Sequence, residues 1–215
     1  REEARKLAKR MREEGFIPFI GTPDLNSMDI SNIEVQPRRV AMVYDPREGD
    51  LATNAGHSYV GGLLEYLGYR VDYLPADIAM PDYRFSGVYA GVITWMTSGP
   101  PQDSPAFNRW INARLDEKVP VVFLAGLPVE DKLLLKRMGL KRDAPPATQV
   151  LTITHQDKAL LGAFEAPVQP RSRDLTAVAV LPNGPTPALT LTNEGGDTYN
   201  PVVVGEWGGL ALAPY

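Results

Sequence analysis

Residues 119–130, VPVVFLAGLPVE, form the stretch that decides the fold. The apolar run Val121–Leu124 contains no polar residue, which is typical of a strand buried on both faces of a parallel sheet. A turn of small residues follows, and a helical pattern begins at Glu130. We therefore predict a three-layer α/β fold in which helices cover a parallel sheet, with this strand at its centre.

The carboxyl end of this strand carries no reactive side chain. In parallel α/β sheets, catalytic and ligand-binding residues lie at the carboxyl ends of the strands. A catalytic domain would therefore place a nucleophile or a phosphate loop at Ala125–Pro128. That turn reads AGLP and has no Cys, Ser, Lys or acidic group. We assign no catalytic residue, no cofactor and no metal site, and we interpret the domain as a catalytic scaffold that has become a binding or spacer module.

The composition and charge of the chain limit the kinds of partner that it is expected to bind. The chain has 215 residues, 44% of them hydrophobic, with 22 basic and 26 acidic residues and a net charge of −4. No basic stripe is present, so nucleic acid and anionic lipid are not expected partners. The chain has no Cys, which excludes disulfides, thiolate metal sites and a Cys nucleophile. No apolar run reaches the roughly 18–20 residues that a membrane-spanning helix needs.

The first 36 residues read as the end of another domain. Apolar residues recur at helical spacing in 1–14, and Phe16–Ile20 reads as a short buried strand before a polar loop. A single helix and strand cannot bury their apolar faces alone. We predict that residues 1–36 are the last helix and strand of a preceding (β/α) barrel, and that residues 37–215 form the α/β domain.

A first group of candidate ligand-binding residues follows the strand expected at Val40–Tyr44. Asp45 stands at its carboxyl end, and Glu48 lies in the acidic loop that comes next. Carboxylates repel phosphate, so a flavin or nucleotide loop is disfavoured here. A flavin or nucleotide binder is accordingly the weakest functional class.

A second group surrounds the strand expected at Val88–Trp95. Thr97 and Ser98 follow it, and their hydroxyls could bind a ligand, although such residues are also common in loops. His57 opens the helix that follows the first strand, and it is a candidate general base or simply a polar residue near a helix start. A hydrolase that uses Ser98 or Thr97 with His57 therefore stays open as an alternative.

The pattern changes to short alternating strands after residue 145, so we expect a β-rich C-terminal part. Near its end, Glu206 and Trp207 place a carboxylate beside an aromatic ring. This pair could stack on a sugar and bond its hydroxyls, or Trp207 could pack against the sheet instead. The segment Glu206–Gly209 could fold back near the other candidate residues.

Four stretches carry a resemblance to a known family. They are GFIPFIGTPDL (15–25), IEVQPRRVAMVYD (33–45), GLLEYLGYRVDYLP (62–75) and VVVGEWGGLALAPY (202–215). Together they resemble the middle of the PelA family, bacterial hydrolase/deacetylases of the Pel exopolysaccharide found in biofilm matrix. The resemblance implies a flavodoxin-like or class I glutamine amidotransferase-like region between a glycoside hydrolase barrel and a polysaccharide deacetylase. It also implies a periplasmic location.

The resemblance does not supply an active site to this chain. The nucleophile elbow of the amidotransferase fold would fall at Ala125–Leu127, which contains no Cys, and the catalytic residues of the flanking enzymes would lie outside the chain. What it implies is a non-catalytic accessory or linker domain that orients the hydrolase and deacetylase modules. Its expected partners are those modules, with exopolysaccharide or a protein of the secretion complex as further candidates. A carbohydrate-binding module is the remaining alternative.

Overall fold

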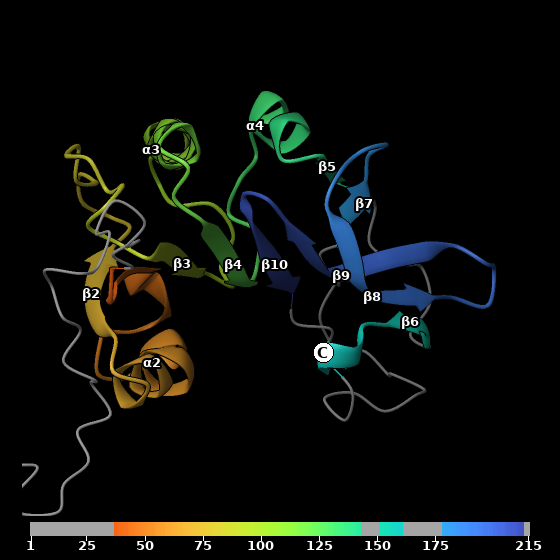
Figure 1. Cartoon of the computed structure of the whole chain (residues 1–215), viewed down its shortest axis with the longest axis horizontal. Helices are drawn as coiled ribbons and strands as arrows, with labels where there is room; N and C mark the ends of the chain where they lie inside the picture. Colours follow the sequence, from red (N-terminus) through yellow and green to blue (C-terminus); the bar gives the residue numbers. More distant parts are fainter. Residues whose placement is uncertain (1–36, 143–150, 161–177, 213–215) are drawn as a thin grey trace, which may run out of the picture. The chain divides into compact units, whose positions relative to one another are not determined.

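The computed structural model describes residues 37–142, 151–160 and 178–212 (Figure 1). All of them belong to the second of the two units into which the chain divides, residues 36–215. The barrel end predicted for residues 1–36 lies outside the described part and stays a prediction.

The described residues build one eight-stranded mixed sheet in the order β2-β1-β3-β4-β10-β9-β8-β6. The five strands from β2 to β10 run parallel, and the pairs β10–β9, β9–β8 and β8–β6 are antiparallel. The predicted α/β fold with a β-rich C-terminal part is therefore confirmed. The strands are β1 (Arg39–Tyr44), β2 (Arg70–Pro75), β3 (Gly91–Trp95), β4 (Val121–Ala125), β6 (Thr152–Gln156), β8 (Thr186–Thr192), β9 (Thr198–Gly205) and β10 (Gly208–Leu212).

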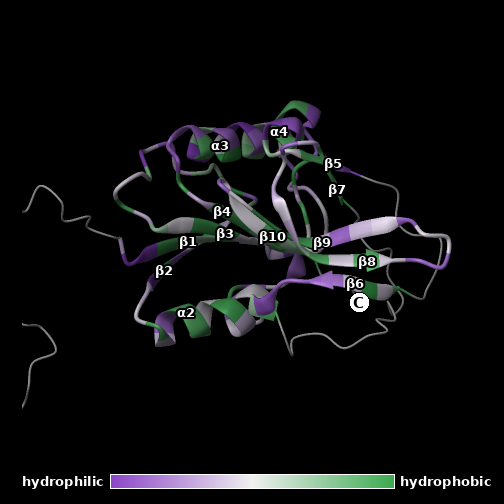
Figure 2. Ribbon diagram, turned by 45° about the vertical axis from the view of Figure 1, so that its right-hand side comes forward, coloured by the Kyte–Doolittle hydropathy of each residue, from purple (hydrophilic) through white to green (hydrophobic). Residues whose placement is uncertain are grey.

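Helices cover both faces of the parallel half of this sheet. The helices α3 (Ser104–Asp116) and α4 (Lys132–Arg137) lie on one face, and α2 (Gly62–Tyr66) lies on the other (Figure 2). A π-helical turn, η3 (His57–Gly61), leads into α2. Two short 3-10 turns, η2 (Pro46–Glu48) and η4 (Lys158–Leu160), and a separate two-stranded sheet of β5 (Leu140–Arg142) and β7 (Val178–Val180) complete the elements.

The main core lies between the sheet and the two helices α3 and α4. The inward stripe of α3 is the one its spacing predicts, with Phe107, Trp110, Ile111 and Leu115 all buried. It packs against the parallel strands, among which β4 contributes the fully buried Phe123.

Specific residues set the start of α3 and the packing of α2. The N-cap of α3 is Asp103, whose side chain accepts a hydrogen bond from the Ala106 N–H, and Ser104 is the first helical residue. Leu63 and Leu67 do not pack on the sheet and are 62% and 63% exposed. The helix is instead held to the sheet at Gly61, where a side chain would collide with the Tyr73 hydroxyl.

The strand β10 is absent from the sequence prediction. Its first residues, Gly208 and Gly209, are poor strand formers, and we interpreted them as part of a ligand-binding segment. The structure gives a reason for both, since a Cβ atom on Gly209 would lie 2.7 Å from the Val203 carbonyl oxygen. A Cβ atom on Gly208, which has φ 120°, would lie 2.1 Å from the Val121 carbonyl oxygen, so only glycine lets β10 pair with β4.

An ion pair joins β1 to the edge strand β2, and a hydrogen bond at the same carboxylate adds the loop before β3. Asp72 on β2 accepts hydrogen bonds from the Arg39 guanidinium and from the Tyr89 hydroxyl, the latter at 2.8 Å. Burial alone would raise the pKa of Asp72, but these hydrogen bonds and the charges of Arg39 and Arg70 outweigh burial and lower it. The same surroundings raise the pKa of Tyr89, chiefly through burial.

We predict that Asp72→Asn lowers the free energy of unfolding at pH 7 by about 1 kcal/mol, because the charged acceptor of two hydrogen bonds is lost. A lowered folded-state pKa stabilises the fold above the ordinary carboxyl pKa of about 3.9, and this contribution disappears as pH falls through the folded-state value. The difference between wild type and variant should therefore be constant from pH 6 to 8, roughly, and vanish in acid. Urea unfolding at several pH values measures it. The control is Asp77→Asn, an exposed residue on the following loop.

Candidate functional site

The sheet order places a topological switch point at β1. The chain passes from β1 outward to β2 and then crosses back to β3 on the other side. Because β1 and β3 are parallel and Tyr44 lies opposite Trp95, their carboxyl ends open at the same edge of the sheet. Four predicted site residues follow directly: Asp45 and Glu48 after β1, and Thr97 and Ser98 after β3.

Asp45 is buried but already bound. Its side chain is 2% exposed, and both of its carboxylate oxygens accept hydrogen bonds from the Arg47 guanidinium at 2.5–3.0 Å. Oδ1 also accepts from the Arg47 backbone N–H, so Asp45 caps the turn η2. The hydrogen bond to Asp45 is the main cause of the raised pKa of Arg47. Arg47 donates once more to the Pro100 carbonyl, which leaves Asp45 as an anchor for the loop rather than a ligand-binding group.

Glu48 binds the other strand end. Its Oε1 accepts hydrogen bonds from the backbone N–H groups of Thr97, at 2.5 Å, and Ser98, at 2.6 Å. Two adjacent N–H groups aimed at one oxygen form a concave anion site of the kind that binds phosphate or an oxyanion. In this chain the anion is Glu48 itself, so the strongest donors at the crevice are satisfied internally.

His57 is turned toward β2. Its ring packs edge-on against Tyr73 with 5.2 Å between ring centroids, and β1 separates that strand from β3. Its Nδ1 is buried and has no hydrogen-bond partner within the described part of the chain. Burial, followed by the nearby Glu65, raises the pKa of Tyr73 to about 12, so its hydroxyl stays protonated at neutral pH. No hydrogen bond between described residues joins His57 to Thr97 or Ser98.

The end of β4 has a strained backbone at Ala125. Ala125 has φ 67°, a left-handed conformation that is uncommon for any residue other than glycine. Next to it, a Cβ atom on Gly126 would lie 2.0 Å from the Met96 carbonyl oxygen, so the turn packs directly on the end of β3. In a nucleophile elbow the strained residue carries the nucleophile, whereas Ala125 carries only a methyl group.

Arg142 is a residue that sequence reasoning missed. It extends from β5 and donates hydrogen bonds to the carbonyl oxygens of Leu127, at 2.5 Å, and Val129, at 3.0 Å. Burial lowers its pKa. Arg142 therefore fixes the loop that follows Ala125. No local pattern signals this role, since a single Arg beside the polar residues 141–143 is typical of a solvated surface.

The expectation that Glu206–Gly209 folds back near these residues is wrong. Gly208 pairs with Val121 at the start of β4, whereas the crevice lies at the end of that strand. Trp207 donates its indole N–H to the Met138 carbonyl at 2.9 Å, and its ring centroid lies 6.0 Å from that of Phe123. Packing against the sheet is thus the main role of Trp207. Glu206 is exposed beside it, along a hollow of about 620 Å³.

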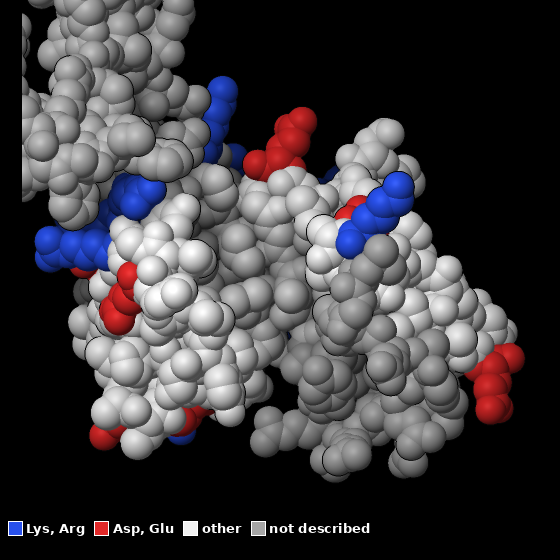
Figure 3. All heavy atoms as spheres, turned by 60° about the horizontal axis from the view of Figure 1, so that its bottom comes forward, with Lys and Arg blue, Asp and Glu red and all other residues white. Residues whose placement is uncertain are grey.

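The described residues show neither a cluster of three or more His, Asp or Glu side chains able to hold a metal ion nor a helix long and apolar enough to cross a membrane. On the face in Figure 3, both signs of charge are interspersed with uncharged side chains. Among the described residues of that face, no continuous basic stripe is visible.

Comparison with known proteins supports the fold alone. No protein-family model matches the sequence, and no curated protein is significantly similar to it. Among solved structures, a glutamine amidotransferase from Thermotoga maritima is similar with a TM-score of 0.50 and 14% identity, over 83% of this chain and 75% of that one. A putative ThuA-like protein from Bacteroides uniformis has a TM-score of 0.49 and 12% identity, over 84% and 83% of the two chains. A glutamine amidotransferase from Methylobacillus flagellatus has a TM-score of 0.48 and 16% identity, over 80% and 66%.

The fold is therefore class I glutamine amidotransferase-like, as expected from the sequence. At this level of identity the likeness says nothing about activity. The residues Ala125–Leu127, where the nucleophile elbow was expected, include no Cys.

We predict that Glu48→Ala lowers the free energy of unfolding by about 1 kcal/mol and speeds hydrogen exchange at the amides of Thr97 and Ser98, because both lose their acceptor. Amide exchange followed by NMR measures the local effect. The control is Glu206→Ala, which removes an exposed carboxylate at the opposite edge of the sheet. Unchanged exchange at Thr97 and Ser98 in the Glu48 variant would contradict this account of the crevice.

Proposed function

We propose that the α/β domain is a non-catalytic accessory domain of a multidomain enzyme that modifies an exopolysaccharide. The observation that carries the proposal is the turn after β4, where the strained elbow position holds Ala125. An elbow without a nucleophile cannot form a covalent intermediate. The neighbouring anion site is filled by Glu48, which would have to leave before any oxyanion could bind there.

The finer assignment rests on the sequence resemblance. Four stretches spread from residue 15 to residue 215 resemble the PelA family, in which such a region lies between a glycoside hydrolase barrel and a deacetylase. We propose accordingly that this domain orients those two modules on the Pel polymer in the periplasm. Its partners are the adjacent modules of the same polypeptide, and polymer or a secretion-complex protein are further candidate partners.

Rigidity is what an orienting domain requires, and several contacts of the described residues supply it. Loops at the crevice are tied by charged groups: Arg47 joins the end of β1 to the Pro100 carbonyl, and Glu48 joins η2 to β3. Arg142 fixes the loop after β4 in the same way. Charge-assisted hydrogen bonds are stronger than neutral ones, so these loops are held in one arrangement.

The alternative hydrolase would use Ser98 or Thr97 as nucleophile and His57 as base. It requires two changes. His57 must turn away from Tyr73, and Glu48 must release the backbone N–H groups of Thr97 and Ser98. The buried, unpartnered Nδ1 of His57 is the single observation in its favour.

The orienting role predicts that replacing residues 37–215 by a flexible linker of similar reach in the parent enzyme leaves hydrolysis and deacetylation of short oligosaccharides unchanged. Activity on the long polymer should fall several-fold, because the two modules no longer act on the same polymer molecule at the same time. Product release from both substrates measures the effect. Equal activity of the two proteins on polymer would overturn the orienting role.

A further inference from the structure

An exposed apolar face runs along the helical segment formed by η3 and α2. Its four large side chains are Tyr59, Leu63, Tyr66 and Leu67. Their positions follow the spacing i, i+4, i+7 and i+8, which places them on one side of a helix. Each is at least 62% exposed, and Tyr66 is 88% exposed. Apolar side chains that gather in one exposed patch mark an interaction site on a soluble protein.

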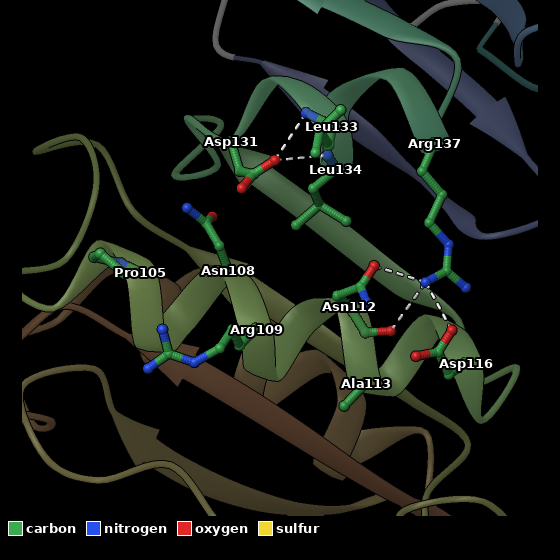
Figure 4. Close-up of a pocket in the computed structure, with 10 residues that line it drawn as sticks. All are labelled: Pro105, Asn108, Arg109, Asn112, Ala113, Asp116, Asp131, Leu133, Leu134 and Arg137. Atoms are coloured by element: carbon green, nitrogen blue, oxygen red, sulfur yellow. Dashed lines mark hydrogen bonds and ion pairs between the residues drawn. The ribbon is translucent and has the colours of Figure 1, made fainter.

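The helices on the other face of the sheet present paired polar groups instead. Arg137 on α4 donates from Nη1 to Oδ1 of Asn112, at 2.6 Å, and to Oδ1 of Asp116, at 2.8 Å (Figure 4). Leu133 is the one large apolar side chain of α3 and α4 that is exposed. The apolar face of η3 and α2 is therefore a property of that side of the domain and not of its helices in general.

A glycine that the fold of this chain does not require lies within the apolar face. At Gly61 a Cβ atom would lie 2.1 Å from the Tyr73 hydroxyl oxygen, so glycine is needed there for packing on the sheet. At the exposed Gly62, no atom outside its own stretch of helix lies within 4 Å of the place of a Cβ atom. Glycine is less stable than alanine inside a helix, and close approach of another backbone is what it allows.

We propose that two copies of this chain associate through this face, as an antiparallel pair of helical segments related by a two-fold axis near Gly62. Tyr59 lies three positions before that axis and Tyr66 four positions after it, so Tyr59 of one copy meets Tyr66 of the other. Leu63 of each copy then lies over Gly62 of the other. The face is self-complementary, as a two-fold interface requires.

The charges around the face agree with this pairing. Arg38 lies at the C-terminal end of α2, where a Cβ atom on Gly68 would be 3.1 Å from its Nη1. Asp50 precedes the other end of the helical segment and is exposed. Antiparallel pairing brings the Asp50 end of one copy beside the Arg38 end of the other. Glu65 of each copy lies on the opposite side of the axis from its equivalent, so like charges stay apart.

This inference goes beyond the proposed function and does not depend on it. The face of one short helical segment is smaller than half of a standard interface of about 1,600 Å². We therefore expect a weak dimer, with a dissociation constant of roughly 10–100 μM.

Sedimentation velocity of the 215-residue chain, from roughly 1 μM to 500 μM, tests the proposal. We expect monomer at the low end and dimer, with no larger species, at the high end. Tyr66→Ser should raise the dissociation constant about tenfold and leave the melting temperature of the monomer unchanged, because the lost ring is 88% exposed. The matched control is Leu133→Ser, which removes an exposed leucine of α4 and should dimerise as wild type does.

Gly62→Ala separates the proposal from a purely structural role of the helix. Alanine favours the helix and its Cβ atom has open space in the monomer, so the melting temperature of the monomer should rise. The added methyl group keeps the two helices apart, so dimerisation should weaken several-fold. A chain that stays monomeric throughout would overturn the proposal and leave the face to a different partner. Dimerisation that is unchanged in Tyr66→Ser or Gly62→Ala, or lost equally in Leu133→Ser, would overturn it as well.

Discussion

The parallel pairing of β10 with β4 is the constraint on which the rest of the structure depends. It runs from Gly208 opposite Val121 to Leu212 opposite Ala125, and it joins the parallel half of the sheet to the antiparallel half. The pairing begins only because Gly208 has no side chain to strike the Val121 carbonyl. With β10 in place, β4 has a strand on each side and its fully buried Phe123 lies in the core.

This pairing also separates two regions that the sequence left free to meet. Trp207 precedes β10 and lies at one edge of the sheet, where its indole N–H donates a hydrogen bond to the Met138 carbonyl oxygen. The end of β4 carries Ala125 to the opposite edge, beside the backbone of β3. At that second edge the charged groups bind the protein itself: Asp45 holds Arg47, and Glu48 holds the N–H groups after β3. An edge that supplies ligand sites in related architectures is here used to fix loops.

Strong local patterns account for what the sequence predicts correctly. The unbroken apolar run at Val121–Leu124 is buried well as a strand inside a parallel sheet. The apolar stripe of α3 is buried well by a helix that lies on such a sheet. The rule that ligands meet the carboxyl ends of parallel strands likewise places Asp45, Thr97 and Ser98 at one edge. What these side chains do there could not be predicted, because their partners are backbone groups distant in sequence.

Long-range contacts account for what the sequence misses. The strand β10 begins with two glycines, and the positions of the Val121 and Val203 carbonyls explain why glycine is required at each. The anchoring of the loop after β4 by Arg142 depends on packing between elements. A spacing rule within one segment cannot reveal contacts of this kind.

The central claim is that the crevice at the ends of β1, β3 and β4 performs no covalent chemistry. The most direct test incubates the purified chain with glutamine and with an acetylated hexosamine oligomer, and measures ammonia and acetate. With Ala125 at the elbow and Glu48 on the donors of β3, we expect neither product above the level of buffer alone. Ammonia or acetate release that disappears in His57→Ala and Ser98→Ala, with both variants folded, would contradict the account and establish the hydrolase alternative.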